Sequence, residues 1–168
     1  MPPHGTSFSP ILPHATAVIT GSFLSGTMMG LSLITVPVLL ETATQPAYLL
    51  QHFVRLYDVG HKMMPGLAVT TCFFYGIAGV GQRAGARSAL PQLVAGLTTI
   101  AIVPFTWLVM TPTNDALFQL QADAGAARLG EVRQLLVRWG WLHAVRSCFP
   151  LMGAVLGLRY LLRATFGW

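Results

Sequence analysis

Three residues in the last third of the chain have types and a spacing that suit chemistry: Trp139, His143 and Arg146. Their i, i+4, i+7 spacing places an aromatic ring, an imidazole and a guanidinium on one face of a helix. Directly after them, residues 147–158 form an apolar stretch that is expected to enter a bilayer. Ionisable groups at membrane depth are costly, so they usually face a cavity, a partner or a substrate, and an imidazole there can act as a base or as a hydrogen-bond donor. The same pattern also fits an interfacial anchor, with Trp among headgroups and Arg reaching for phosphates, so both interpretations stay open.

The rest of the chain predicts an integral membrane protein. Of its 168 residues, 54% are hydrophobic and only 9% are charged, which is too apolar for an ordinary soluble domain. Four segments reach or approach the roughly 20 apolar residues that cross a bilayer. The predicted fold is therefore all-α, an integral membrane four-helix bundle. The four segments are residues 15–40, 63–80, 89–110 and 142–162.

The first 14 residues predict a flexible, Pro-rich tail. They lack Lys and Arg, and the apolar run that follows is longer than the core of a signal peptide, so we expect the first span to be retained. His4 and His14 are expected to be solvated. Residues 15–168 then form a single four-span transmembrane domain.

Four spans place the connections 41–62 and 111–141 on the same side of the membrane. All five acidic residues lie there. The net charge is +5, but Lys and Arg are scattered singly between apolar segments, which favours anionic membrane lipids as partners and argues against nucleic acid.

Both of these connections contain amphipathic sequence. Leu49, Phe53 and Leu56 share one helical face, which predicts an interfacial helix over residues 48–57 that Gly60 can end. In the second connection, the apolar periodicity predicts that a long fourth helix begins in the interface near Arg128 and continues into the membrane.

Small residues recur at the spacing that lets transmembrane helices approach closely. They predict packing faces within one bundle, and the same motif leaves a homo-oligomer open. Three prolines in the spans invite kinks. The small residues are Ser22, Gly26, Gly30, Gly153 and Gly157, and the prolines are Pro37, Pro104 and Pro150.

Polar side chains of the acidic side gather beside the ends of the spans, where a bundle would bring them to one end. No GxGxxG or phosphate-binding loop and no haem or iron–sulfur motif occurs, so the expected chemistry needs no cofactor of these kinds. A metal is a weaker alternative, because no HxxxH or HxH pair is present. Its candidate ligands are His52, His61 and His143 with Asp58 or Glu41.

Several tracts resemble the anthrone oxygenase family of small fungal membrane proteins. The resemblance extends over nearly the whole chain, from about Ala15 to Leu158. Its most specific parts are the PTN motif and the WxxLHxxR pattern that ends at Arg146. The similar tracts are residues 21–30, 57–62, 105–114 and 136–139, the WxxLHxxR pattern of residues 139–146, and Pro150, Leu151 and Gly153.

The resemblance implies oxidation of the central methylene of a polyketide anthrone, such as an emodin anthrone, to an anthraquinone by molecular oxygen. That methylene lies between aromatic rings opposite a carbonyl, so loss of a proton gives a delocalised anion that can pass an electron to oxygen. A base, a donor for the oxyanion and a dry aromatic slot then suffice, without a flavin or a metal.

The same resemblance implies roles for individual residues. His143 would take the methylene proton, and Arg146 would stabilise the oxyanion. Asn114 would donate a hydrogen bond to a ring oxygen or peroxide. The remaining candidates are His61 with Asp58 as a second base, and Trp139, Trp107 and Thr113 as substrate-binding residues.

Two other functions remain open at this point. One is a non-catalytic membrane scaffold or metabolite-binding protein of a polyketide pathway, and the other is a metal-dependent oxidase of another phenolic polyketide. The expected location is the endoplasmic reticulum or another endomembrane.

Overall fold

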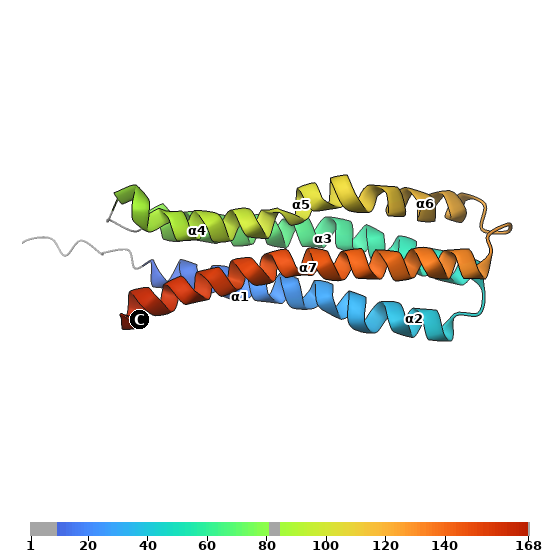
Figure 1. Ribbon diagram of the computed structural model, residues 1–168, viewed down its shortest axis with the longest axis horizontal. Helices are drawn as coiled ribbons and strands as arrows, with labels where there is room; N and C mark the ends of the chain where they lie inside the picture. Colours follow the sequence, from blue (N-terminus) through green and yellow to red (C-terminus); the bar gives the residue numbers. More distant parts are fainter. Residues whose placement is uncertain (1–9, 81–84, 168) are drawn as a thin grey trace, which may run out of the picture.

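The structure is a computed structural model that describes residues 10–80 and 85–167, with the side chains of the second part described from residue 89. Its elements join into four long helical stretches, which Figure 1 shows side by side. The first is α1 (Ile11–Gly30), the π-helical segment η1 (Leu31–Thr35) and α2 (Val36–Thr42). The second is α3 (Pro46–Val80). The third is α4 (Gly85–Ile100), α5 (Ile102–Phe105), the π-helical segment η2 (Thr106–Met110) and α6 (Thr111–Ala122), and the fourth is α7 (Leu129–Phe166).

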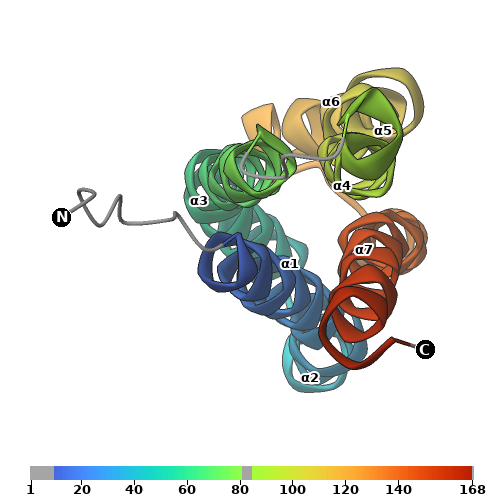
Figure 2. The same cartoon turned by 90° about the vertical axis from the view of Figure 1, so that its left-hand side faces the viewer.

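The four stretches form a bundle in which α1 packs against α3 and α7, and α4 packs against the same two helices from the opposite side (Figure 2). The α2–α3 and α6–α7 connections lie at one end of the bundle, and the C-terminus of α7 lies at the other (Figure 1). All four stretches are long and apolar enough to cross a membrane. The prediction of an all-α, multi-pass membrane protein is confirmed.

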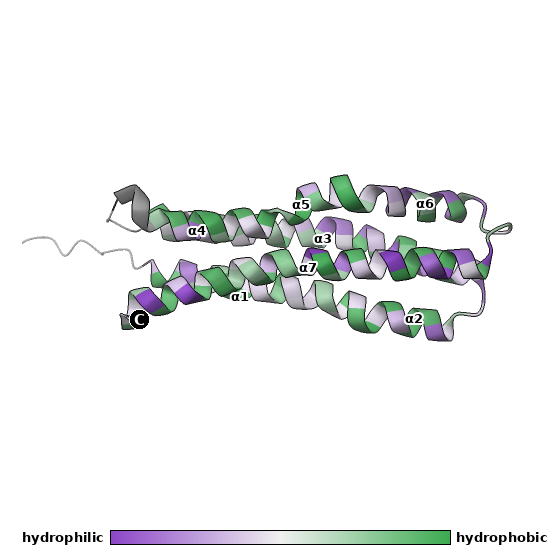
Figure 3. Ribbon diagram, viewed as in Figure 1, coloured by the Kyte–Doolittle hydropathy of each residue, from purple (hydrophilic) through white to green (hydrophobic). Residues whose placement is uncertain are grey.

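Each stretch is longer than a bilayer requires. The four are 32 to 38 residues long, whereas about 20 residues span the hydrocarbon layer. Polar residues are frequent in α6 and in the parts of α3 and α7 near the two connections, which therefore extend beyond the hydrocarbon layer (Figure 3). This end holds the largest apolar core, in which Phe53 packs with Leu117, Leu136 and Trp139.

The interfacial helix expected over residues 48–57 is not a separate element. Instead, α3 runs without a break from Pro46 through Gly60 to Val80, and only residues 43–45 connect it to α2. The physical reason is that Leu49 and Phe53 bury their apolar face against α6 and α7 and not against lipid. The prediction for the fourth helix is confirmed, because α7 begins at Leu129 with Arg128 as its N-cap.

The last residues of the predicted tail, from Ile11 to His14, belong to the first helix. Residues 1–9, including His4, lie outside the described part of the chain, but α1 already begins at Ile11. His14 is only 2% exposed, and its Nε2 lies 2.9 Å from the carbonyl oxygen of Gly157 in α7. The expectation of a solvated His14 was therefore wrong, because this imidazole joins the two helices.

The prediction that small residues form the packing faces of the helices is confirmed for α7 and wrong for α1. A Cβ at Gly153 would come within 2.7 Å of the Ala95 carbonyl oxygen, so hydrogen at this position lets α4 and α7 approach. In α1, however, Gly26 and Gly30 have no described atom within 4 Å of such a Cβ. Gly21 and Ser25 form the buried face instead. A homo-oligomer formed through the open face of α1 stays a prediction.

The prolines have different effects. The third stretch is interrupted at Ala101, whose N–H donates to the carbonyls of both Leu97 and Thr98. Pro104 follows three residues later and cannot donate to the preceding turn. Pro37 stands at the start of α2, directly after the π-helical segment η1, and Pro150 lies inside the continuous helix α7.

Candidate active site

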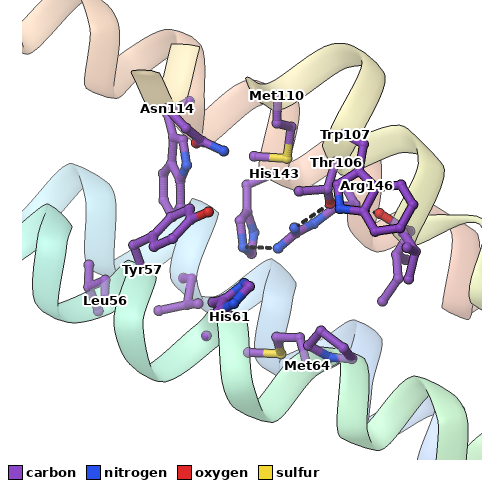
Figure 4. A pocket seen from close by; sticks show the side chains of 16 residues that line it. Leu56, Tyr57, His61, Met64, Thr106, Trp107, Met110, Asn114, His143 and Arg146 are labelled. Atoms are coloured by element: carbon purple, nitrogen blue, oxygen red, sulfur yellow. Dashed lines mark hydrogen bonds between the residues drawn. The ribbon is translucent and has the colours of Figure 1, made fainter. Parts of the chain in front are cut away.

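A pocket of about 310 Å³ lies among α3, the third stretch and α7. Most of its lining is apolar or aromatic, which suits a flat, largely apolar ligand. Figure 4 shows the side chains of these helices pointing toward one another around it. The lining residues are Leu56, Tyr57, Gly60, His61, Met64 and Pro65 of α3, Ile102, Val103, Thr106, Trp107, Met110 and Asn114 of the third stretch, Trp139, His143 and Arg146 of α7, and Leu31 of η1.

The polar centre of the pocket is the pair formed by His143 and Arg146. Arg146 Nη2 lies 2.7 Å from His143 Nε2, and Arg146 Nη1 donates to Thr106 Oγ1 at 2.8 Å (Figure 4). His143 is only 2% exposed. The ring of Trp139 lies against the imidazole, with a centroid distance of 4.7 Å. The one-turn spacing on α7 therefore places all three side chains on the inner face of this helix.

Arg146 carries a positive charge that no lining carboxylate neutralises, since the described lining contains neither Asp nor Glu. Its Nε is buried and has no hydrogen-bond partner in the described structure. The side-chain oxygen of Asn114 is likewise buried and unpartnered. A buried cation with spare donors in a low-dielectric pocket is suited to stabilising an oxygen anion.

Six of the eight predicted site residues line this pocket: His143, Arg146, Asn114, His61, Trp139 and Trp107. The other two do not. Asp58 is exposed on α3 outside the lining, and Thr113 is buried one position from Asn114 on a different face of α6. Trp107 lines the pocket while remaining 72% exposed, so it stands at the mouth.

Sequence reasoning missed three polar groups of the site. Tyr57 lines the pocket and stacks on His61 with a centroid distance of 5.6 Å. Their i, i+4 spacing on α3 was a usable signal. Ser32 and Thr106 contact His143 and Arg146 from other helices, and nothing local in the sequence marks such long-range contacts.

A metal site would need several ligating side chains of the described residues to lie close together. Within them, no group of three or more His, Cys, Asp or Glu side chains gathers in a way that could hold a metal ion. The five candidates from the sequence therefore do not converge.

Comparison with known proteins agrees with the resemblance noted in the sequence. The sequence model of the anthrone oxygenase family matches residues 53–156. The anthrone oxygenase tpcL of Aspergillus fumigatus is 66% identical over 155 residues, which cover 92% of this chain and 96% of the relative. The anthrone oxygenase nsrD of Aspergillus novofumigatus is 50% identical, with 89% and 93% covered. The noranthrone monooxygenase of Aspergillus flavus is 42% identical, with 84% and 70% covered.

Fold and pocket together define a multi-pass membrane protein with an imidazole–guanidinium pair in an aromatic-lined pocket. The extent of these matches identifies it further: the chain belongs to the anthrone oxygenase family. No solved structure matches it.

Proposed function

We propose that this protein oxidises the central methylene of a polyketide anthrone with molecular oxygen and releases the anthraquinone. The relatives' names supply the substrate class. The observation that carries the proposal is Arg146, a guanidinium directed at an apolar pocket without a lining carboxylate. Such a charge is costly unless it meets an anion, and an anthrone becomes an anion when it loses its methylene proton.

The overall reaction balances without a reductant. Loss of one methylene proton to the base gives the anthrone anion, whose oxidation by O₂ and recombination form a peroxide anion at the same carbon. The proton returns from the base to give the hydroperoxide. The hydroperoxide then loses water as its O–O bond breaks, and this water contains the returned proton, the second methylene hydrogen and one oxygen atom. The other oxygen atom stays as the new ketone.

Arg146 supports this reaction by binding the oxyanion that forms at the carbonyl opposite the methylene. Asn114 lines the same pocket and would donate a hydrogen bond from its amide group to a ring oxygen or the peroxide, and Trp139 and Trp107 supply aromatic lining for the rings. Exclusion of water by these side chains strengthens the attraction between guanidinium and oxyanion.

The choice of base is constrained by a simple geometric fact. The methylene carbon and the carbonyl oxygen of an anthrone lie at opposite ends of its central ring, whereas His143 and Arg146 are in direct contact. If Arg146 holds the oxyanion, His143 lies at the same end of the ring, and its Nε2 lone pair already accepts a hydrogen bond from the guanidinium. His61, which lines the pocket from α3, is therefore the base we favour over His143.

The direct test is turnover of emodin anthrone by membranes that contain this protein, under oxygen and with the spontaneous oxidation rate subtracted. We expect anthraquinone formation well above that rate, with one O₂ consumed per anthrone. Wild-type membranes that match empty membranes would refute the proposed function and would favour a non-catalytic scaffold or metabolite-binding protein.

The location within the cell is also a proposal. A multi-pass chain whose substrate is an apolar polyketide fits the endoplasmic reticulum or another endomembrane. Co-fractionation of the tagged protein with an endoplasmic reticulum marker would support this location, and enrichment with plasma membrane would contradict it.

A further inference from the structure

The contacts behind the His143–Arg146 pair follow one pattern on both sides. Ser32 Oγ donates its hydrogen to the Met28 carbonyl at 3.3 Å, and Thr106 Oγ1 donates to the Ile102 carbonyl at 2.7 Å. Both carbonyls lie four residues earlier on the same helical stretch. Because a hydroxyl has one hydrogen, each oxygen is left as an acceptor toward the pair.

The guanidinium of Arg146 determines which ring nitrogen of His143 carries hydrogen. A guanidinium has donors only, so Arg146 Nη2 must donate to Nε2, and Nε2 must carry a lone pair. The hydrogen of the neutral imidazole is then on Nδ1, which faces Ser32 Oγ at 3.4 Å. The hydrogen bonds thus run outward from Arg146 on both sides, through His143 to Ser32 in η1 and directly to Thr106 in η2.

Ser32 and Thr106 also lie in the same kind of backbone, a π-helical segment. Ser32 belongs to η1 and Thr106 to η2, the two π-helical segments of the described chain. In these segments, the N–H groups of Val36 and Thr111 donate to carbonyls five residues back. Such π-helical turns are rare and are frequent at functional sites, because they shift where side chains point.

We propose that Ser32 and Thr106 are positioning residues that clamp this pair, Ser32 by accepting a hydrogen bond from Nδ1 and so fixing the orientation of the His143 ring, and Thr106 by fixing the guanidinium of Arg146. The inference rests on the proposed function, in which Arg146 binds the oxyanion. Held at both ends, the guanidinium keeps its remaining donors aimed at the pocket without reorganising when charge develops.

Thr106→Val tests the guanidinium end, since it removes the acceptor at nearly constant shape. We expect kcat for emodin anthrone to fall roughly ten- to a hundredfold, because a hydrogen bond to a charged group is lost, while KM changes little. Thr106→Ser should restore most of the rate. The matched control is Thr98→Val, because Thr98 also donates to its own helix, at the Val94 carbonyl, but lies outside the pocket.

Nitrogen NMR of histidine-labelled protein tests the imidazole end without substrate. His143, assigned by its loss in His143→Gln, should show a protonated Nδ1 and an unprotonated Nε2 in the wild type. Ser32→Ala should keep this tautomer, because Arg146 still donates to Nε2, but should shift the Nδ1 resonance, because the Ser32 acceptor is lost. Ser22→Ala, at an exposed position of α1, should leave the spectrum unchanged.

The outcomes separate the two proposals. An unprotonated Nδ1 in the wild type, an unchanged Nδ1 resonance in Ser32→Ala, or wild-type kcat in Thr106→Val would overturn the clamp. A wild type that shows the expected tautomer but oxidises no anthrone would overturn the proposed function and leave the tautomer assignment standing.

Discussion

The guanidinium of Arg146 and the imidazole of His143 form one unit, with Nη2 and Nε2 2.7 Å apart on consecutive turns of α7. Under the proposed function, the two groups therefore meet the substrate at the same end of its ring system. The chemistry at the opposite end then needs a group from another helix.

Replacement of Arg146 by Lys tests whether catalysis needs the two-pronged donor geometry of the guanidinium or only its positive charge. Lysine keeps the charge but cannot donate in a fixed geometry to Thr106 and His143 at once. We expect kcat to fall about a hundredfold, as for loss of an oxyanion donor. Arg138→Lys, on an exposed face of α7, is the control. Steady-state kinetics in nanodiscs measure both, and an Arg146→Lys enzyme with wild-type kcat would rule out the bidentate role.

Chemical rescue distinguishes the two candidate bases. His61 is exposed at the pocket, whereas His143 is 2% exposed. Added imidazole should therefore restore turnover of His61→Ala, because it can occupy the space of the missing side chain, and should not rescue His143→Ala. His52→Ala, outside the pocket, should behave as wild type. Rescue of His143→Ala alone would return the role of base to His143.

Local periodicity was sufficient to predict much of this site. The spacing of Trp139, His143 and Arg146 placed them on one face, and α7 begins where its apolar pattern begins. These features depend only on helical geometry, which neighbouring residues determine.

What sequence reasoning missed depends on contacts between distant helices. An amphipathic face can lie on lipid or on protein, so residues 48–57 did not reveal that α3 continues through Gly60 against α6 and α7. Likewise, Ser32 and Thr106 look like ordinary helical hydroxyls until η1 and η2 bring them to the pair. Packing between the spans determines both the length of α3 and the position of these two hydroxyl groups.

His14 offers a stability prediction at the opposite end of the bundle. Its Nε2 is 2.9 Å from the Gly157 carbonyl oxygen, and its ring stacks on Tyr160 with a centroid distance of 5.6 Å. We expect His14→Ala to destabilise the fold by about 1–3 kcal/mol through loss of this buried hydrogen bond and its packing. Thermal unfolding in detergent measures the change, while kcat of the folded fraction should stay at the wild-type value. An unchanged melting temperature would show that this contact does not stabilise the bundle.

Gly157→Ala tests whether close approach of helices holds the spans together. A Cβ at Gly157 would collide with the hydroxyl and ring of Tyr75, whose OH donates to the Gly153 carbonyl at 3.0 Å. Tyr75 is fully buried and cannot move aside, so we expect about 1–3 kcal/mol of destabilisation from overpacking and a lower melting temperature.

Gly26→Ala is the matched control, since no described atom lies within 4 Å of that position. Because alanine favours helix over glycine, the control should melt at the wild-type temperature or above it. If both variants melted alike, α3 and α7 would not depend on this close contact; if only Gly26→Ala lowered the melting temperature, the open face of α1 would be the one that packs, in a homo-oligomer.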